Sequence, residues 1–296
     1  MQTLEYLNLP HCLRLSNGDA EVIVSTDIGP RVLRYALEGG ENVLAELPEM
    51  SVTTALGHWN PRGGHRLWIA PEIMPGSYAP DNGPLEHEIL GPLSVRLKQR
   101  VDAAHFEKEM TITLEPSGSG VTVHHKITNR SSFAVQVAPW ALTIVRSGTV
   151  LLPQEPYKSH ADELLPARAL VLWPFTDLSD PRWIFGPRFI RLKADPNLPQ
   201  AQKIGAMNKQ GYLAHHSSDT LFIKRFDFLE GHTYPDYGSN CEAYVEGAFQ
   251  EVESLGPLKV ILPDESLEHV EKWTLHADFK LSQSDDELEA ALTKLL

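Results

Sequence analysis

Short runs in which apolar and polar residues alternate, closed by Gly and Pro turns, constrain the fold of this chain most. The segment 240–281 shows the pattern best, with runs at 248–255 and 258–262 separated by Gly256-Pro257, and a third run at 268–281. Successive side chains of a strand point to opposite faces, so such alternation predicts strands that bury one face. The segment therefore predicts consecutive antiparallel strands.

Similar patterns recur along most of the chain. Further strands are predicted on either side of a turn at 27–30 and at 41–46, 93–101, 106–114, 121–129, 133–145, 183–193, 202–216 and 220–228. The segments 51–92 and 153–182 are rich in turn residues and weakly periodic, and we expect both to be irregular. A capping box at 284–287, followed by LEAALTKLL, predicts one helix.

These elements predict an all-β fold of two large antiparallel sheets with a short C-terminal helix. Two packed sheets are favoured over a closed barrel at this length. No composition shift or linker divides the sequence, so we expect residues 1–296 to form a single domain.

The charge and cysteine content exclude several classes of function. A formal net charge of −13 disfavours nucleic-acid and anionic membrane partners, which need a basic surface. The N-terminus lacks the pattern of a signal peptide, and Cys12 and Cys241 form no paired motif, so we expect a cytoplasmic protein. Phosphate-loop, dinucleotide-binding and spaced metal-ligand motifs are absent, so we expect no cofactor and no metal.

Two acids in the run 248–255 are the strongest candidates for chemistry. Strand alternation places Glu251 and Glu253 on one face together with Phe249. Paired carboxylates can act as general base and polar anchor, because repulsion between them raises one pKa. The alternative is that both acids lie on a solvated face of a sheet.

The sequence GGHRLW at 63–68 offers groups suited to a sugar. Arg66 supplies a planar fork of donors and Trp68 a flat apolar face, while His65, which directly precedes Arg66, is a weaker candidate. The alternative is a turn with a core tryptophan and a surface arginine. The arrangement predicts a small-molecule carbohydrate as the partner, bound in part by this segment.

Other polar candidates lie in less regular segments. His87 could serve as an acid, since a histidine titrates near neutrality. Asp236 and Asn240 belong to the turn that precedes the acid-bearing run, and both could bind hydroxyl groups or serve only the turn itself.

Several motifs resemble those of galactose mutarotase-like proteins. The matching segments are AEVIVSTDIGPRVLRYALEGGENVLAE, GGHRLWIAPE, the PW of APWALTI and FQEVESLGPLKVILPDESLEHVEKWTL. They keep the order of the family's elements over most of the chain, and they are similar to an uncharacterised branch of that superfamily. The resemblance implies a β-supersandwich that holds a sugar on its concave face.

The resemblance also implies roles for individual residues. In the family's aldose 1-epimerases, a late-strand Glu takes the proton of the anomeric hydroxyl and a His protonates the ring oxygen. Glu253 matches this base, Glu251 is its neighbour, Arg66 matches an Arg that grips hydroxyls, and His87 matches a His. Trp140 stands near the position of the family's catalytic His, where it can stack on a sugar but deliver no proton.

Three classes of function follow from these observations. The first is a carbohydrate-active protein, and in particular an aldose epimerase that uses Glu253 as its base. The second is a sugar-binding protein without catalysis, which the Trp at position 140 favours. The third is glycoside hydrolase or lyase chemistry, which shares paired acids and sugar-binding sheets.

Overall fold

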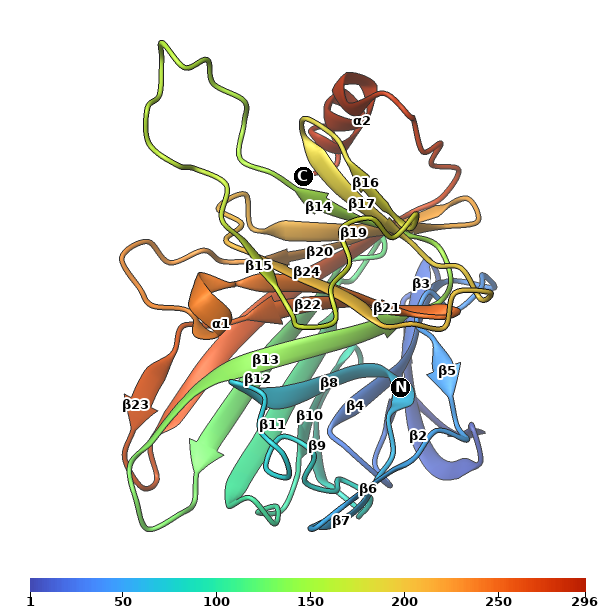
Figure 1. The fold of residues 1–296 in the computed structure, drawn as a ribbon. Helices are drawn as coiled ribbons and strands as arrows, with labels where there is room; N and C mark the ends of the chain where they lie inside the picture. The colour runs from blue at the N-terminus through green and yellow to red at the C-terminus, as the bar shows by residue number, and fades with distance from the viewer.

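The computed structural model describes residues 1–296 and contains two large antiparallel sheets that pack face to face (Figure 1). The first has twelve strands, ten of which follow one another in the order β1 (Gln2–Tyr6), β2 (Leu9–Ser16), β3 (Ala20–Ser25), β4 (Arg31–Leu37), β8 (Arg62–Ala70), β13 (Val135–Val145), β22 (Phe249–Leu255), β21 (Cys241–Glu246), β18 (Gln202–Ala206) and β15 (Leu170–Leu172). Two short strands complete it, namely β5 (Glu46–Leu47) beside β8 and β23 (Lys259–Ile261) beside β13.

The second sheet has ten strands and covers the inner face of the first. Its order is β16 (Trp183–Phe185), β17 (Phe189–Lys193), β14 (Thr149–Pro153), β19 (Tyr212–Ser217), β20 (Thr220–Phe226), β24 (Ser266–His276), β12 (Val121–Asn129), β11 (Phe106–Leu114), β10 (Ser94–Lys98) and β9 (Glu86–Gly91). A separate hairpin is formed by β6 (Val52–Thr54) and β7 (Gly57–Trp59). The predicted all-β fold of two large antiparallel sheets is confirmed.

Two short helical segments accompany the sheets. In α2 (Asp285–Leu292) the Ser284 hydroxyl accepts a hydrogen bond from the Glu287 amide, as the capping box predicted, and Leu288 and Leu292 pack against the second sheet. The other segment, α1 (Pro235–Gly238), is a single turn that precedes β21. Neither helix combines the length and the apolar character needed to span a bilayer.

The main core lies between the two sheets, where alternate side chains of each strand meet. Burial alternates strictly along β11, so that Met110 and Ile112 are buried while their neighbours are partly exposed. These residues pack with Val22 and Tyr35 from the opposite sheet and with Trp273 of β24. The predicted alternation therefore identified the core face of this strand.

Lys224 of β20 is a charged group within this core. Its ammonium lies 2.7 Å from Glu271 and donates to the carbonyl oxygens of Ala141 (2.8 Å) and Val252 (3.0 Å) in the opposite sheet. Such a fully buried charge requires this complete set of partners. It ties the second sheet to β13 and β22.

The segment 51–92 differs from the expectation of an irregular stretch. It contains β8, a central strand of the first sheet, together with β6, β7 and β9. Eight of the nine residues of β8 are buried, on both faces, so its sequence shows no apolar–polar alternation. The chain also begins with two strands, β1 and β2, that the alternation pattern does not predict.

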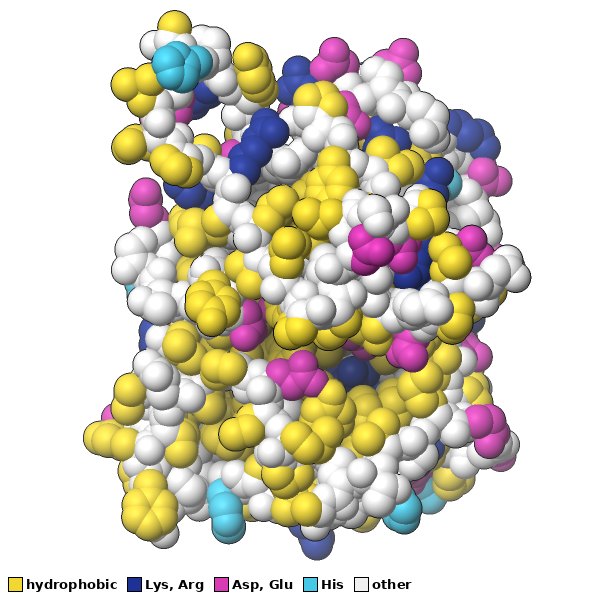
Figure 2. Space-filling view, in the orientation of Figure 1, with side chains coloured by type: hydrophobic (Ala, Val, Ile, Leu, Met, Phe, Trp, Pro, Cys, Tyr) yellow, Lys and Arg dark blue, Asp and Glu magenta, His cyan; other side chains and the backbone are white.

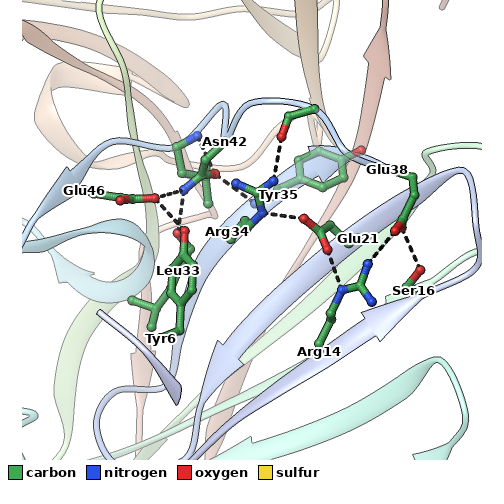
Figure 3. Close-up of polar contacts among 12 residues, drawn as sticks. Tyr6, Arg14, Ser16, Glu21, Leu33, Arg34, Tyr35, Glu38, Asn42 and Glu46 are labelled. Atoms are coloured by element: carbon green, nitrogen blue, oxygen red, sulfur yellow. Dashed lines mark hydrogen bonds and ion pairs between the residues drawn. The ribbon is translucent and has the colours of Figure 1, made fainter. Parts of the chain in front are cut away.

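Charged side chains tie together the strands near the N-terminal edge of the first sheet (Figure 3). Glu21 of β3 accepts from Arg14 of β2 and from Arg34 of β4, both at 2.5 Å. Arg14 also reaches Glu38 at 2.6 Å. This network crosses three adjacent strands and leaves the acids there without a free carboxylate for a ligand.

Candidate functional site

Five strands of the first sheet form the floor of the candidate site. On β8, β13, β22 and β21, the residues Arg66, Leu142, Glu253 and Glu242 are paired in one row. A neighbouring row contains Ile144, Glu251, Tyr244 and Lys203. Paired residues of adjacent strands share a face, and residues two apart on one strand do too, so both rows project to the same side. That side is the face turned away from the second sheet.

A cavity of about 330 Å³ lies over this floor. Its charged lining residues are Arg66, Glu72, Lys203, Glu246 and Glu251. Figure 2 shows a hollow on this side of the molecule, where hydrophobic side chains surround a few acidic and basic ones. The remaining lining is dominated by aromatic side chains, which are Trp59, Trp68, Tyr78, Trp140, Trp173, Phe175, Tyr244 and Phe249. Aromatic walls with a few polar groups are typical of small-molecule sites.

Glu251 faces Arg66 within the cavity. The Arg66 Nη2 lies 3.4 Å from Glu251 Oε1, and the guanidinium lies over the rings of Trp59 and Trp68, 4.9 and 4.6 Å from their centroids. Burial raises the pKa of Glu251 to about 7, with the charge of Glu253 adding to the rise and Arg66 opposing it. Glu251 therefore exchanges a proton near neutral pH.

Lys203 of β18 is the second cation of the cavity. Its ammonium lies between the rings of Trp140 and Trp173, 4.7 and 4.8 Å from their centroids, and 2.6 Å from Glu242 and 3.0 Å from Glu253. Burial opposes its charge, but these two carboxyl groups hold the Lys203 pKa above its usual value. An ammonium ion thus persists in a largely apolar setting.

One ammonium cannot balance two buried carboxylates. Burial raises the pKa of Glu242 well above its usual value, and repulsion from Glu253 adds to the effect against the pull of Lys203. Glu253 accepts at Oε2 from Lys203 and from Trp140 Nε1, the latter at 2.7 Å, and is fully buried. Burial and this repulsion therefore favour the protonated form of Glu242, and the Lys203 ammonium also pairs with Glu253.

Several of the predicted site residues are brought together by the fold. Arg66, Trp68, Trp140 and Glu251 line the cavity. Glu253 lies beneath them, bonded to two of the lining residues. Asp236 is close enough to Lys203 and Glu242 to be affected by both, although burial dominates and raises its pKa.

The other predicted residues lie elsewhere. His87 is an exposed residue of β9, at the edge of the second sheet, so the expectation that it supplies a proton in the site is not met. His65 is on the opposite face of β8 from Arg66 and points between the sheets, because adjacent residues of a strand alternate. Asn240 is buried and pairs through its side chain with the backbone of Asn208, at 2.6 and 2.8 Å.

His65, His125 and Glu271 form the cluster whose ligand atoms converge most like those of a metal site. Burial lowers the pKa of His125 to about 3 and that of His65 well below its usual value, so both rings are neutral. His125 Nδ1 faces a carbonyl oxygen at 2.9 Å and must carry its proton, which leaves Nε2 to accept from His65 Nε2 at 2.7 Å. A hydrogen-bond chain, completed by Thr143, accounts for this cluster.

The sequence did not predict Lys203, Glu242 or Trp173 as site residues, although it did predict Trp140. Glu242 had a signal, because the two-residue turn at 247–248 makes β21 and β22 a hairpin whose register pairs it with Glu253. Lys203 had none, since β18 joins β21 through a pairing that no local pattern specifies.

The raised pKa of Glu251 predicts a pH-dependent effect of Glu251→Gln on stability. A carboxyl whose pKa rises from 4.5 to about 7 on folding stabilises the fold fully below pH 4.5 and loses that contribution as pH passes 7. Urea unfolding measures the free energy of unfolding of both proteins at pH 5 and at pH 8. The value for the variant minus that for the wild type should be about 2–3 kcal/mol higher at pH 8 than at pH 5. If the free energy of unfolding changed equally with pH in both proteins, the assigned cost of burying the Glu251 carboxylate would be contradicted.

Comparison with known proteins addresses the fold. No protein-family profile matches the sequence, and no curated protein matches it. A galactose mutarotase-like protein from Lactobacillus casei ATCC 334 matches with a TM-score of 0.58 at 12% identity, over 90% of this chain and 100% of that one. A galactose mutarotase related enzyme from Lactobacillus acidophilus matches with a TM-score of 0.52 at 10% identity, over 92% and 100%.

A larger protein shares the same fold in part. The galactosidase domain of the alpha-galactosidase-sucrose kinase AgaSK matches with a TM-score of 0.53 at 10% identity, over 94% of this chain and 42% of that chain. Identities this low carry information about architecture alone. By its architecture, the chain has the fold of the galactose mutarotase-like proteins.

Proposed function

We propose that this protein binds a free aldose in the cavity and interconverts its anomers. The observation that carries the proposal is Glu251, a cavity-lining carboxyl with a pKa of about 7 beside an arginine and opposite a lysine. A general base works best when its pKa lies near the working pH. The tryptophan rings of the cavity offer flat faces for the C–H side of a sugar.

In the proposed reaction, the Glu251 carboxylate takes the proton of the anomeric hydroxyl. The bond between C1 and the ring oxygen breaks, and the ring oxygen takes a proton from the Lys203 ammonium. The open aldehyde then turns about its C1–C2 bond and closes on either face, returning both protons. Tyr244 separates Glu251 from Lys203 in the row, so their Cα atoms are about 10 Å apart, which leaves room for a ring.

This assignment gives Glu253 a different role from the one that the family resemblance implied. Glu253 is fully buried and accepts from Trp140 and Lys203, so it is held beneath the cavity. Glu251 lines the cavity and is the better placed proton acceptor. We therefore propose that Glu253 orients Lys203 and that Glu251 acts as base.

The proposal is tested by polarimetry or exchange NMR on a panel of aldoses. We expect at least one aldose to equilibrate faster with the protein, with kcat/KM rising through pH 7 as Glu251 ionises in the free protein. Absence of acceleration for every aldose, in a sample that binds one of them by calorimetry, would reject catalysis.

That outcome would favour sugar binding without turnover. One observation speaks for this second candidate: Lys203 is already held by Glu242 and Glu253, within 2.6 and 3.0 Å. An ammonium held in this way binds hydroxyl groups well but gives up its proton reluctantly, because its charged form is favoured. A measured affinity without rate enhancement would identify the protein as a binder.

A further inference from the structure

The charged rows of the cavity floor lie between the paired Trp68 and Trp140 on one side and apolar residues on the other. Charged groups occupy the row of Arg66 and Glu253 and its neighbour at Glu251. Past Glu251 along β22, the next residue on this face is Phe249, and beside Glu251 on β13 the floor ends with Ile144. A ligand held over Glu251 therefore extends onto an apolar surface.

The wall at this end is apolar too. Pro61 immediately precedes β8, and Gly64 of β8 pairs with Ile144, so Pro61 lies at the Ile144 end of the cavity. Met50 follows β5, whose Leu47 pairs with the first residue of β8, and it lines the cavity at the same end. Neither side chain offers a hydrogen bond to a hydroxyl group.

Two polar residues of the lining, Tyr244 and Glu246, lie beside Glu251 and Phe249 on β21, and they bond to each other. The Tyr244 hydroxyl donates to Glu246 at 2.8 Å. A sugar hydroxyl placed against Ile144, Phe249 and Met50 would lose its bonds to water without replacement, which is unfavourable. The volume of about 330 Å³ lies in the range of pockets that hold drug-sized ligands.

We propose that the ligand is a reducing sugar that carries an apolar substituent, alkyl, acyl or aryl, on a carbon away from C1. This inference rests on the proposed function, which places the sugar between Glu251 and Lys203 and requires a free anomeric hydroxyl. The substituent lies on Phe249, Ile144 and Met50, and the sugar ring lies over the charged row that contains Glu251 and Lys203.

Calorimetry on D-galactose, D-glucose and their 4-O-benzyl and 6-O-benzyl derivatives tests the inference. A benzyl derivative should bind about 10- to 30-fold more tightly than its parent sugar, from the apolar area that it buries. Phe249→Ser and Met50→Ser should each reduce the ratio between the affinities for the benzylated sugar and for its parent. Phe133→Ser, which changes a phenylalanine that is 77% exposed outside the cavity, should not alter the preference.

The possible results separate this inference from the proposed function. Equal affinities for parent and benzylated sugars would overturn the apolar subsite while anomerisation of the parent sugar still supported the proposed function. A benzyl preference that survives both substitutions would overturn the location. If no aldose binds, substituted or not, both the proposed function and this inference fail.

Discussion

Replacement of Glu251 by glutamine is expected to lower kcat/KM for anomeric exchange by about 100-fold or more, the usual contribution of a general base. The amide keeps the size of the side chain but cannot take the proton of the anomeric hydroxyl. Polarimetry at pH 8, where wild-type Glu251 is ionised, gives the largest contrast. His87→Gln is the control and should retain the wild-type rate, because His87 is exposed on the other sheet.

Glu253→Gln distinguishes the two carboxyls that share this face. If Glu251 is the base, the Glu253 variant retains a rise of rate with pH, displaced below pH 7 because the charge of Glu253 no longer raises the Glu251 pKa, and its rate falls because Lys203 has lost a counter-ion. If Glu253 is the base, its variant loses the pH dependence and Glu251→Gln keeps it. Wild-type rates in Glu251→Gln would remove that residue from the mechanism.

Replacement of Lys203 by methionine is expected to destabilise the protein by about 3–5 kcal/mol at pH 8, the typical cost of breaking a buried ion pair. The change leaves Glu242 and Glu253 buried without a cation. Urea unfolding measures the loss. It should be smaller at pH 5, because burial raises the pKa of Glu242 and its protonation reduces the uncompensated charge.

Lys280→Met serves as the matched control for this effect. Lys280 pairs with Asp219 at 2.8 Å, but its side chain is 79% exposed, so the pair contributes little. Its loss should leave the free energy of unfolding close to that of the wild type. Equal effects of the two substitutions would show that the cluster around Lys203 is not a stabilising ion pair.

The sequence predicted the acid-bearing strand because one of its faces contains polar groups among apolar neighbours. Alternation is a local property, so the shared face of Phe249, Glu251 and Glu253 could be derived without any long-range contact. The same reasoning identified the helix cap at Ser284. Where a strand is buried on both faces, as β8 is, alternation disappears, and the segment was mistaken for an irregular stretch.

The roles of individual polar residues depended on which strands become neighbours. His65 and Arg66 are adjacent in sequence, yet one contacts His125 between the sheets and the other contacts Glu251 in the cavity. The sequence offers His87 as a candidate acid, but its strand β9 pairs only with β10 and forms the edge of the second sheet. No local pattern contains this information.

The all-β class, the paired acids on one strand face and the terminal helix could be predicted from local patterns, because periodicity and capping act within a few residues. The contacts of Lys203 with Glu242 and Glu253, and of Arg66 with Glu251, depend instead on how distant strands pair in the folded sheet. The tertiary structure also decided the protonation of these groups. Burial and neighbouring charge set the pKa values, and both arise only when the sheets have formed.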